Sequence, residues 1–262
     1  NYKKSNMITK IFEKIDLWLS KSSLISFIFS KKTTSPRSYQ SQINILENKI
    51  EILELGIDKI LLNDMPKPLS IEKSLNRIIE DTLSVGRFGD GEFRLMYEDN
   101  YSLNFQEYNN ELSNKLRDIF EKQSSNDFNY MNGITWGYGG DPYFRASMIY
   151  AYNHAVKNKS NFLDAKITWR LEDHSNVELW KRIFLNKKLV IITGLGSDFI
   201  YNDDLFGISK SIQMVYTTPV NAWDNYDSLY HYCQTLDEDN LILLSLGPTA
   251  TVLSFELAKI GF

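Results

Sequence analysis

From residue 70 onward, segments with helical spacing of apolar residues alternate with short apolar runs. Apolar positions three or four residues apart predict helices, and short continuous or alternating apolar runs predict strands. Helices are expected at 70–83, 110–122, 145–157, 177–184, 223–235 and 248–259. Strands are expected at 167–169, 189–192, 212–216 and 241–246, and a loop rich in glycine and aromatic residues at 131–144; a further short apolar run leads into the glycine turn at 89–92.

This alternation of strands and helices predicts an α/β fold with a largely parallel sheet flanked by helices. Ligands of such sheets bind beyond the carboxyl ends of the strands. Turns that contain glycine at these ends are therefore the first candidates for function. Three turns meet the condition: Gly89-Asp90-Gly91-Glu92, Gly194-Leu195-Gly196-Ser197 and Gly247-Pro248-Thr249-Ala250-Thr251.

The first turn carries two carboxylates, Asp90 and Glu92, where an apolar run opens into the next helix. Carboxylate oxygens on one turn can hold a hard divalent cation, which usually keeps positions for water or substrate phosphates. The same spacing is also typical of a solvated turn or a helix start. On chemistry alone, both interpretations stay open.

The other two turns differ in what they can bind. Thr249 and Thr251 stand at a helix start, where free backbone N–H groups and hydroxyls suit a phosphate. The alternative for this turn is a capped helix with proline in its first turn. The turn at Gly194, Gly196 and Ser197 lacks the third glycine of a dinucleotide fingerprint, so a nicotinamide cofactor is not supported.

The first part of the chain has a different pattern. Residues 7–19 show the apolar face of an amphipathic helix, and residues 1–32 carry seven lysines against two acidic residues, a net charge of +5. Together with the apolar stretch at 24–29, this segment could lie in a membrane interface as a peripheral contact. It could equally pack on the main domain or on a second subunit.

Residues 43–60 place apolar side chains at alternating steps of three and four, a heptad seam of nearly three repeats. Such a seam could form a homodimer contact or dock on its own domain. The polar, proline-containing stretch at 33–39 reads as a linker. We therefore expect an N-terminal helical extension at residues 1–64 and an α/β domain at residues 65–262.

Composition narrows the class of protein. The chain has 262 residues and a formal net charge of -4, which argues against nucleic acid as the main partner. The single cysteine, Cys233, excludes an internal disulfide and fits a reducing compartment, so a cytoplasmic location is expected.

Other candidate chemistry is weaker. The three histidines, His154, His174 and His231, form no cluster in the sequence and are expected to be structural or exposed. No Gly-x-Ser-x-Gly elbow is present, which disfavours a hydrolase triad. Aromatic residues of the loop at 131–144 could stack on a base or sugar or anchor the loop to the core. These are Trp136, Tyr138, Tyr143 and Phe144.

Several motifs, taken in order, resemble the bacterial glycosyltransferases of the GT-D fold, a family first catalogued as a domain of unknown function and found with adhesin glycosylation and surface-polysaccharide clusters. The likeness covers residues 70–262. The motifs are Arg87-Phe88-Gly89-Asp90-Gly91-Glu92, Phe105-Gln106-Glu107-Tyr108, the stretch 194–206 with Asn202-Asp203-Asp204-Leu205-Phe206, and the stretch 246–253.

The resemblance implies a Rossmann-like domain that transfers a sugar from a nucleotide-sugar donor, typically UDP-linked, to a glycan, glycolipid or glycoprotein acceptor. It implies that Asp90 and Glu92 bind Mn²⁺ or Mg²⁺, and it leaves the catalytic base unknown. The remaining candidates are donor-binding: Arg87, Phe88, Gly89, Gly194, Gly196, Ser197, Gly247, Pro248, Thr249 and Thr251.

The chain departs from the family in two places. Relatives have Ser-Arg where this chain has Ser197-Asp198, and they continue past the last helix, whereas this sequence stops at Phe262. The resemblance thus implies a domain truncated at its C-terminus. These departures leave an alternative function open, a non-catalytic partner or scaffold subunit of a glycosyltransferase complex. Another nucleotide-using α/β enzyme is a third possibility.

Overall fold

The structure is a computed structural model that describes residue 46 and residues 68–98, 100–121, 128–134, 162–168, 174–197, 199 and 201–262. The chain separates into two compact units, Asn1–Glu47 and Asn48–Phe262. All elements discussed below belong to the second unit. Its strands are β1 Ser84–Phe88, β2 Tyr130–Ile134, β3 Leu163–Asp164, β4 Lys188–Gly194, β5 Ser211–Thr217 and β6 Asn240–Ser245. Its α-helices are α4 Ile71–Asp81, α5 Asp90–Tyr97, α6 Asn110–Glu121, α8 His174–Phe184, α9 Asp203–Phe206, α10 Tyr226–Gln234 and α11 Pro248–Ala258, with 3₁₀ helices η2 Ala165–Thr168 and η3 Ala222–Asn225.

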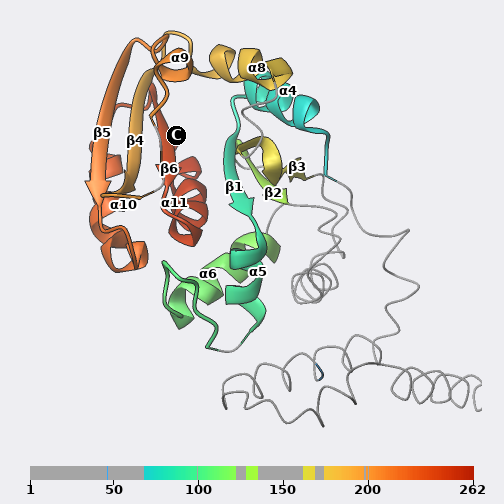
Figure 1. Ribbon diagram of the computed structural model, residues 1–262, viewed down its shortest axis with the longest axis vertical. Helices are drawn as coiled ribbons and strands as arrows, with labels where there is room; N and C mark the ends of the chain where they lie inside the picture. Colours follow the sequence, from blue (N-terminus) through green and yellow to red (C-terminus); the bar gives the residue numbers. More distant parts are fainter. Residues whose placement is uncertain are drawn as a thin grey trace, which may run out of the picture. The chain divides into compact units, whose positions relative to one another are not determined.

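The described strands form two three-stranded sheets, ordered β1-β2-β3 and β5-β4-β6 (Figure 1). Every pairing within them is parallel. In the second sheet the central strand β4 is the most buried, because both of its edges are paired and helices cover both faces. The expected α/β fold with parallel sheets and flanking helices is confirmed.

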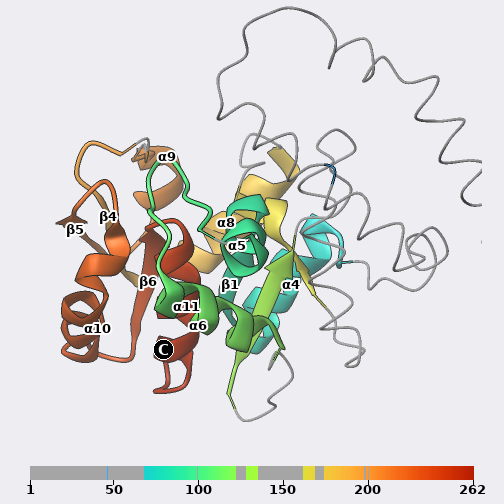
Figure 2. The same cartoon turned by 90° about the horizontal axis from the view of Figure 1, so that it is seen from below.

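Apolar side chains of the second sheet alternate between two cores. Val190, Ile192 and their neighbours pack with residues of α6, α10 and α11 in a core that also contains Phe88 of β1. Leu189 and Ile191 point to the other face, against residues of α4, α8 and α9. The first core therefore joins the two sheets, with α11 packed against β1 (Figure 2).

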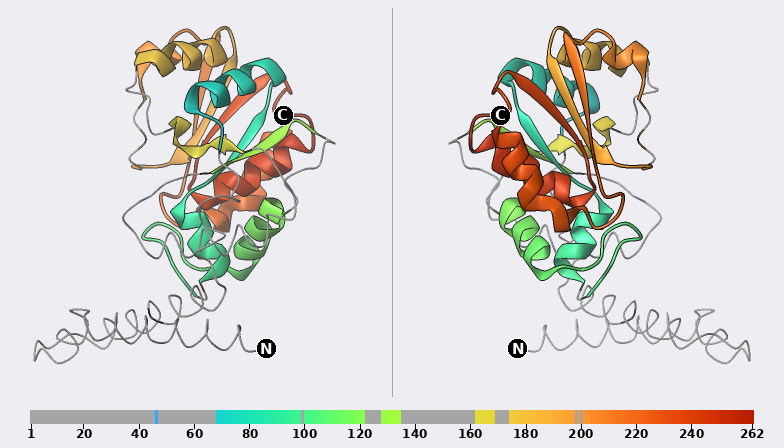
Figure 3. Two further views of the ribbon diagram at one scale, coloured as in Figure 1. Left: turned by 90° about the vertical axis from the view of Figure 1, so that its right-hand side faces the viewer. Right: turned by 90° about the vertical axis from the view of Figure 1, so that its left-hand side faces the viewer.

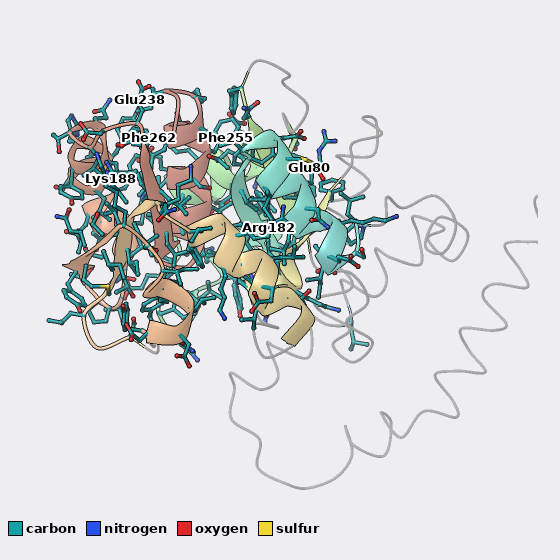
Figure 4. All side chains as sticks on the ribbon, turned by 90° about the horizontal axis from the view of Figure 1, so that it is seen from above. Glu80, Arg182, Lys188, Glu238, Phe255 and Phe262 are labelled. Atoms are coloured by element: carbon teal, nitrogen blue, oxygen red, sulfur yellow. The ribbon has the colours of Figure 1, made fainter. Side chains whose placement is uncertain are left out.

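The strands run in one direction within each sheet, so each sheet has an edge where strands begin and an edge where they end. At the beginning of β1, the Ser84 hydroxyl donates to the carbonyl oxygen of Phe262 at 2.7 Å, which places the end of the chain there (Figure 3). Figure 4 looks onto this edge, where Lys188 at the start of β4 pairs with Asp237 and Asp239. The glycine turns lie at the opposite edge.

Two expected elements need correction. The predicted loop at 131–144 begins with strand β2, Tyr130–Ile134. Gly133 pairs with Leu163 of β3 in this strand. The strand predicted at 167–169 lies earlier, at Leu163–Asp164, and Ile167 belongs to η2, where its buried side chain fills the second core.

Other predictions fall outside the described residues. They are the amphipathic segment at 7–19, the linker at 33–39, the domain boundary at 64–65, the helix at 145–157 and the aromatic side chains at 136–144. Of the heptad segment only Leu46 is described, and it is helical. Among the helices that the structure describes, none is long and apolar enough to cross a membrane.

Candidate functional site

The turn after β1 is built as a helix start. Gly89 is the N-cap of α5, and Glu92, three residues on, turns back so that its Oε2 accepts a hydrogen bond from the Gly89 N–H at 2.8 Å. This satisfies one of the N–H groups that a helix start leaves without a partner. Asp90 occupies the first helical position and is exposed. The expected helix start is therefore confirmed at this turn.

Glu92 is unusually placed for a capping residue, since it is only 6% exposed. Burial raises the pKa of its carboxyl group, while the nearby positive charge of Arg87 lowers it in part. The guanidinium of Arg87 lies beside Gly89, as does Glu92 Oε2. Glu92 Oε1 accepts no hydrogen bond from any of the residues that the structure describes.

The carboxylate oxygens of this turn are the kind of ligand that a divalent cation such as Mg²⁺ or Mn²⁺ takes. A buried carboxylate with one oxygen still open stands next to an exposed carboxylate, and Mg²⁺ or Mn²⁺ commonly takes one or two carboxylates and completes its shell with phosphates and water. No group of three or more metal-ligating side chains occurs among the described residues. The residues therefore fit a cation held jointly by protein and ligand better than one held by protein alone.

The turn after β6 lies against the same place. The Thr251 hydroxyl, in the first turns of α11, donates to the carbonyl oxygen of Arg87 at 2.7 Å. The methyl group of Thr251 also approaches Gly86, where an added Cβ would lie 3.3 Å from it. The hydrogen bond spans 164 positions of sequence and brings the N-terminus of α11 to the end of β1. Two of the three candidate turns thus meet.

Within the α11 turn, conformation and burial are specific. Gly247 has φ +56°, a value that favours glycine, and Pro248 follows at the first helical position. Thr249 is fully buried, and its hydroxyl has no hydrogen-bond partner among the described residues. Pro248 has no N–H and the Ala250 N–H donates to the Gly247 carbonyl oxygen at 2.9 Å, so the positive end of the helix dipole and the unused Thr249 hydroxyl are the features of this N-terminus that suit a phosphate group.

The third turn is beside these two but is partly a structural element. The Ser197 hydroxyl is 2.8 Å from that of Thr193, which occupies it within its own turn. A Cβ on Gly194 would lie 2.7 Å from the Cα of Pro219, so glycine is needed there for packing. Around Gly196, φ +75°, a Cβ would meet nothing within 4 Å, and this part of the turn is open.

Phe88 differs from the other candidates. Its side chain is fully buried, with its ring centroid 5.1 Å from that of Phe120 and 6.1 Å from that of Phe93. The side chain therefore packs in the core and gives the donor no surface.

His231 is exposed on α10, and its Nδ1 is hydrogen-bonded to the carbonyl oxygen of Asp227 in the same helix, as expected for a structural or exposed histidine.

One further part of the carboxyl edge, the loop between α5 and α6 together with Asn221, could not be predicted from the periodicity of the sequence. The loop between α5 and α6 packs Leu103 against Gly91 and Phe105 against Gly247. Its backbone is bonded to Asn221, in the turn after β5. Only the family resemblance of the motif Phe105-Gln106-Glu107-Tyr108 pointed to this loop. Nothing in the sequence pointed to Asn221, which stands in a polar turn.

The arrangement defines a class of protein: a parallel α/β fold with a helix N-terminus and two carboxylates at the carboxyl edge of its sheets. Comparison with known families specifies the class. The model of the glycosyltransferase GT-D fold matches residues 85–262, and the chain belongs to this family.

Two curated relatives are similar in sequence. Glycosyltransferase GlyD of Streptococcus pneumoniae serotype 4 is 28% identical over 229 residues, which cover 79% of this chain and 28% of that protein. Probable glycosyl transferase Gly of Streptococcus gordonii is 28% identical over 232 residues, which cover 81% of this chain and 34% of that protein. The chain thus spans about a third or less of the curated relatives it matches.

Solved structures show the same fold. One, described as a domain of unknown function 1792 with a distinct glycosyltransferase fold, has a TM-score of 0.62 at 26% identity, with 76% of each chain covered. Another, described as a new glycosyltransferase from Streptococcus sanguinis, has a TM-score of 0.61 at 27% identity and covers 75% of this chain and 79% of that one. The expected family and its GT-D fold are confirmed.

Proposed function

We propose that this protein is a metal-dependent glycosyltransferase that moves a sugar from a nucleotide-sugar donor, a UDP-sugar by preference, to a hydroxyl of an acceptor. One observation supports this most directly. The Thr251–Arg87 hydrogen bond holds the N-terminus of α11 against the turn with Asp90 and Glu92. A diphosphate is a group that a cation and the N-terminus of a helix at adjacent positions both favour.

In this proposal Asp90 and Glu92 would hold Mn²⁺ or Mg²⁺ through their carboxylates. When bound, the cation neutralises the diphosphate as the bond to the anomeric carbon breaks. Glu92 can keep its capping bond through Oε2 while Oε1 serves as the ligand. Burial raises the pKa of Glu92, so a bound cation would also favour the ionised form of this buried carboxyl.

The other side chains position the leaving group. The positive end of the α11 dipole and the Thr249 hydroxyl favour the phosphate oxygens, which gain charge in the transition state. The Arg87 guanidinium, beside Gly89, adds positive charge near the same position. Gly247 lets the backbone approach the ligand closely, and the open turn at Gly196 lies along the same edge.

The acceptor and setting are proposed from the family. The proposed acceptor is a glycan, glycolipid or glycoprotein of bacterial surface-polysaccharide assembly or adhesin glycosylation, as the resemblance to the family implies; the names of the streptococcal relatives support the glycosyltransferase activity alone. A cytoplasmic protein that contacts the inner face of the membrane through residues 7–32 fits the basic charge of that segment. The heptad segment at 43–60 would supply a homodimer contact.

A screen of nucleotide-sugars tests the activity. The protein is incubated with Mn²⁺ and each of a panel of UDP-, GDP- and TDP-sugars, and release of the nucleoside diphosphate is measured by chromatography. We expect slow hydrolysis of one donor class, abolished by chelator and by Asp90→Asn. Donor binding without release from any sugar would favour the scaffold function, and tight binding of nucleotides that carry no sugar would favour another nucleotide-using enzyme.

A further inference from the structure

The loop between α5 and α6 crosses the carboxyl edge and contacts three of the turns there (Figure 2). At its first contact, a Cβ on Gly91 would lie 3.1 Å from Leu103 Cδ1. At its second, the ring of Phe105 covers Gly247, where a Cβ would lie 2.6 Å from Cε2. At its third, the Asn221 N–H donates to the Phe105 carbonyl oxygen at 2.8 Å.

Hydrogen bonds hold Phe105 at the tip of a tight turn. Leu103 and Gln106 exchange backbone bonds of 2.8 and 3.4 Å across it. On the far side, Asn221 Oδ1 accepts from the Glu107 N–H at 2.8 Å. Gln106 is 3% exposed, and its Oε1 accepts from the Trp223 N–H at 3.4 Å. The backbone at Phe105 is thus held in position before any ligand arrives.

Despite this fixed position, the Phe105 side chain is 47% exposed. Part of the ring rests on Gly247, directly before α11, and the rest is open to solvent at the edge where the donor is proposed to bind. A single exposed phenylalanine is common on protein surfaces. This ring, however, is carried by a hydrogen-bonded backbone and rests on the glycine before a helix N-terminus, so its open part offers a surface on which a nucleobase can stack.

We propose that Phe105 contacts the nucleobase of the donor, an inference that rests on the proposed function. Phenylalanine has no hydrogen-bonding group, so it favours the flat face of a base over a sugar, whose rim of hydroxyls needs polar partners. Since every base has such a face, Phe105 supplies affinity for nucleotides in general. Asn221 acts as a positioning residue that holds the turn.

Calorimetry with Mg²⁺ separates the base from the diphosphate. Three probes are titrated, UDP, a UDP-sugar and inorganic diphosphate, into wild type, Phe105→Ala, Phe105→Trp and a matched control, Leu185→Ala. Leu185 is 53% exposed and precedes β4, at the opposite edge of the sheet. We expect Phe105→Ala to weaken the affinity for UDP about tenfold and to leave the affinity for diphosphate unchanged. Phe105→Trp and the control should bind all three probes as wild type does.

Two results would overturn the inference: an unchanged UDP affinity in Phe105→Ala, or a loss confined to the UDP-sugar, which would place the ring on the sugar. If wild type bound neither UDP nor diphosphate, the proposed function itself would fail, so the two failures are distinguishable. For the positioning role, Asn221→Gly keeps the left-handed backbone, φ +51°, but loses the acceptor for Glu107, whereas Asn221→Asp keeps both. Only Asn221→Gly should weaken the affinity for UDP relative to that for diphosphate. Equal effects of the two variants would contradict the positioning role of Asn221.

Discussion

Glu92 is predicted to have two separable roles, as a helix cap and as a metal ligand. Glu92→Ala removes the acceptor of the buried Gly89 N–H, whereas Glu92→Gln keeps an oxygen that can accept it. An unsatisfied buried donor costs about 1–3 kcal/mol. For a chain of this length each kcal/mol lowers the melting temperature by about 2–4 °C. In chelator, Glu92→Ala should therefore melt about 2–12 °C below Glu92→Gln.

The charge of Glu92 gives a second signal. Because the folded-state pKa is raised above 4.5, folding favours the protonated carboxyl; this stabilising contribution is full below pH 4.5 and is lost as pH rises through the folded pKa. In chelator, wild type should therefore lose stability relative to Glu92→Gln as pH rises over this window. Near neutral pH, Glu92→Gln should be at least as stable as wild type.

Added metal should stabilise wild type relative to the Glu92 variants. Mn²⁺ at about one hundred times its dissociation constant should stabilise wild type by about 2.7 kcal/mol and neither variant. Thermal melts of the three proteins between pH 4 and 8, with Mn²⁺ and with chelator, make the measurement, and Asp90→Asn serves as a control that loses only the metal increment. Equal melting of the two Glu92 variants in chelator would refute the capping argument, and full metal stabilisation of Glu92→Gln would refute its role as a ligand.

Three further predictions concern packing and burial. Thr251→Val should lower stability by about 1–2 kcal/mol in urea unfolding by removing the bond to Arg87, whereas Thr251→Ser, which keeps the hydroxyl, should lose less; equal losses would contradict this. Gly194→Ala should cost about 1–3 kcal/mol in the same assay, because its Cβ would press on the backbone of Pro219, and a neutral effect would refute the close contact. Cys233, fully buried with its pKa raised to about 11 by desolvation, should react with a thiol reagent at pH 8 only as fast as the protein unfolds; immediate labelling of the folded protein would contradict its burial.

Much of the fold could be predicted because it depends on local patterns. The run 189–192 is uniformly apolar because β4 is paired on both edges and covered on both faces. Ser70 caps α4 through its hydroxyl, which accepts from the Lys73 N–H, as its type and position predict. The helix ends at Asp81, slightly before the predicted residue 83, where Thr82 adopts a left-handed conformation.

The errors arose where tertiary contacts override local signals. Gly133 looked like part of a flexible loop, yet it lies in β2 because the backbone of β3 and η2 passes close to it. Ile167 looked like a strand residue because its side chain is apolar and buried, but a single short apolar run does not distinguish a strand from a 3₁₀ turn.

The candidate site could be predicted only in part. The positions of the three turns followed from the strand pattern, but their contacts did not, because the Thr251–Arg87 bond joins distant parts of the chain. The burial of Glu92 and the packing of Phe88 are likewise properties of the assembled core. The loop with Phe105 had a sequence without periodicity, and its contacts with Gly91 and Gly247 and its hydrogen bonds to Asn221 show where it lies.

Binding of UDP with and without divalent cation is the most direct test of the site. Calorimetry should show that wild type binds UDP in Mn²⁺ and loses at least about tenfold in affinity in chelator, a difference of about 1.4 kcal/mol. Asp90→Asn and Glu92→Gln should behave in Mn²⁺ as wild type does in chelator, while Glu178→Gln, an exposed carboxylate on α8, should change nothing. UDP binding that is equal in Mn²⁺ and chelator, and unchanged by both site substitutions, would contradict the account.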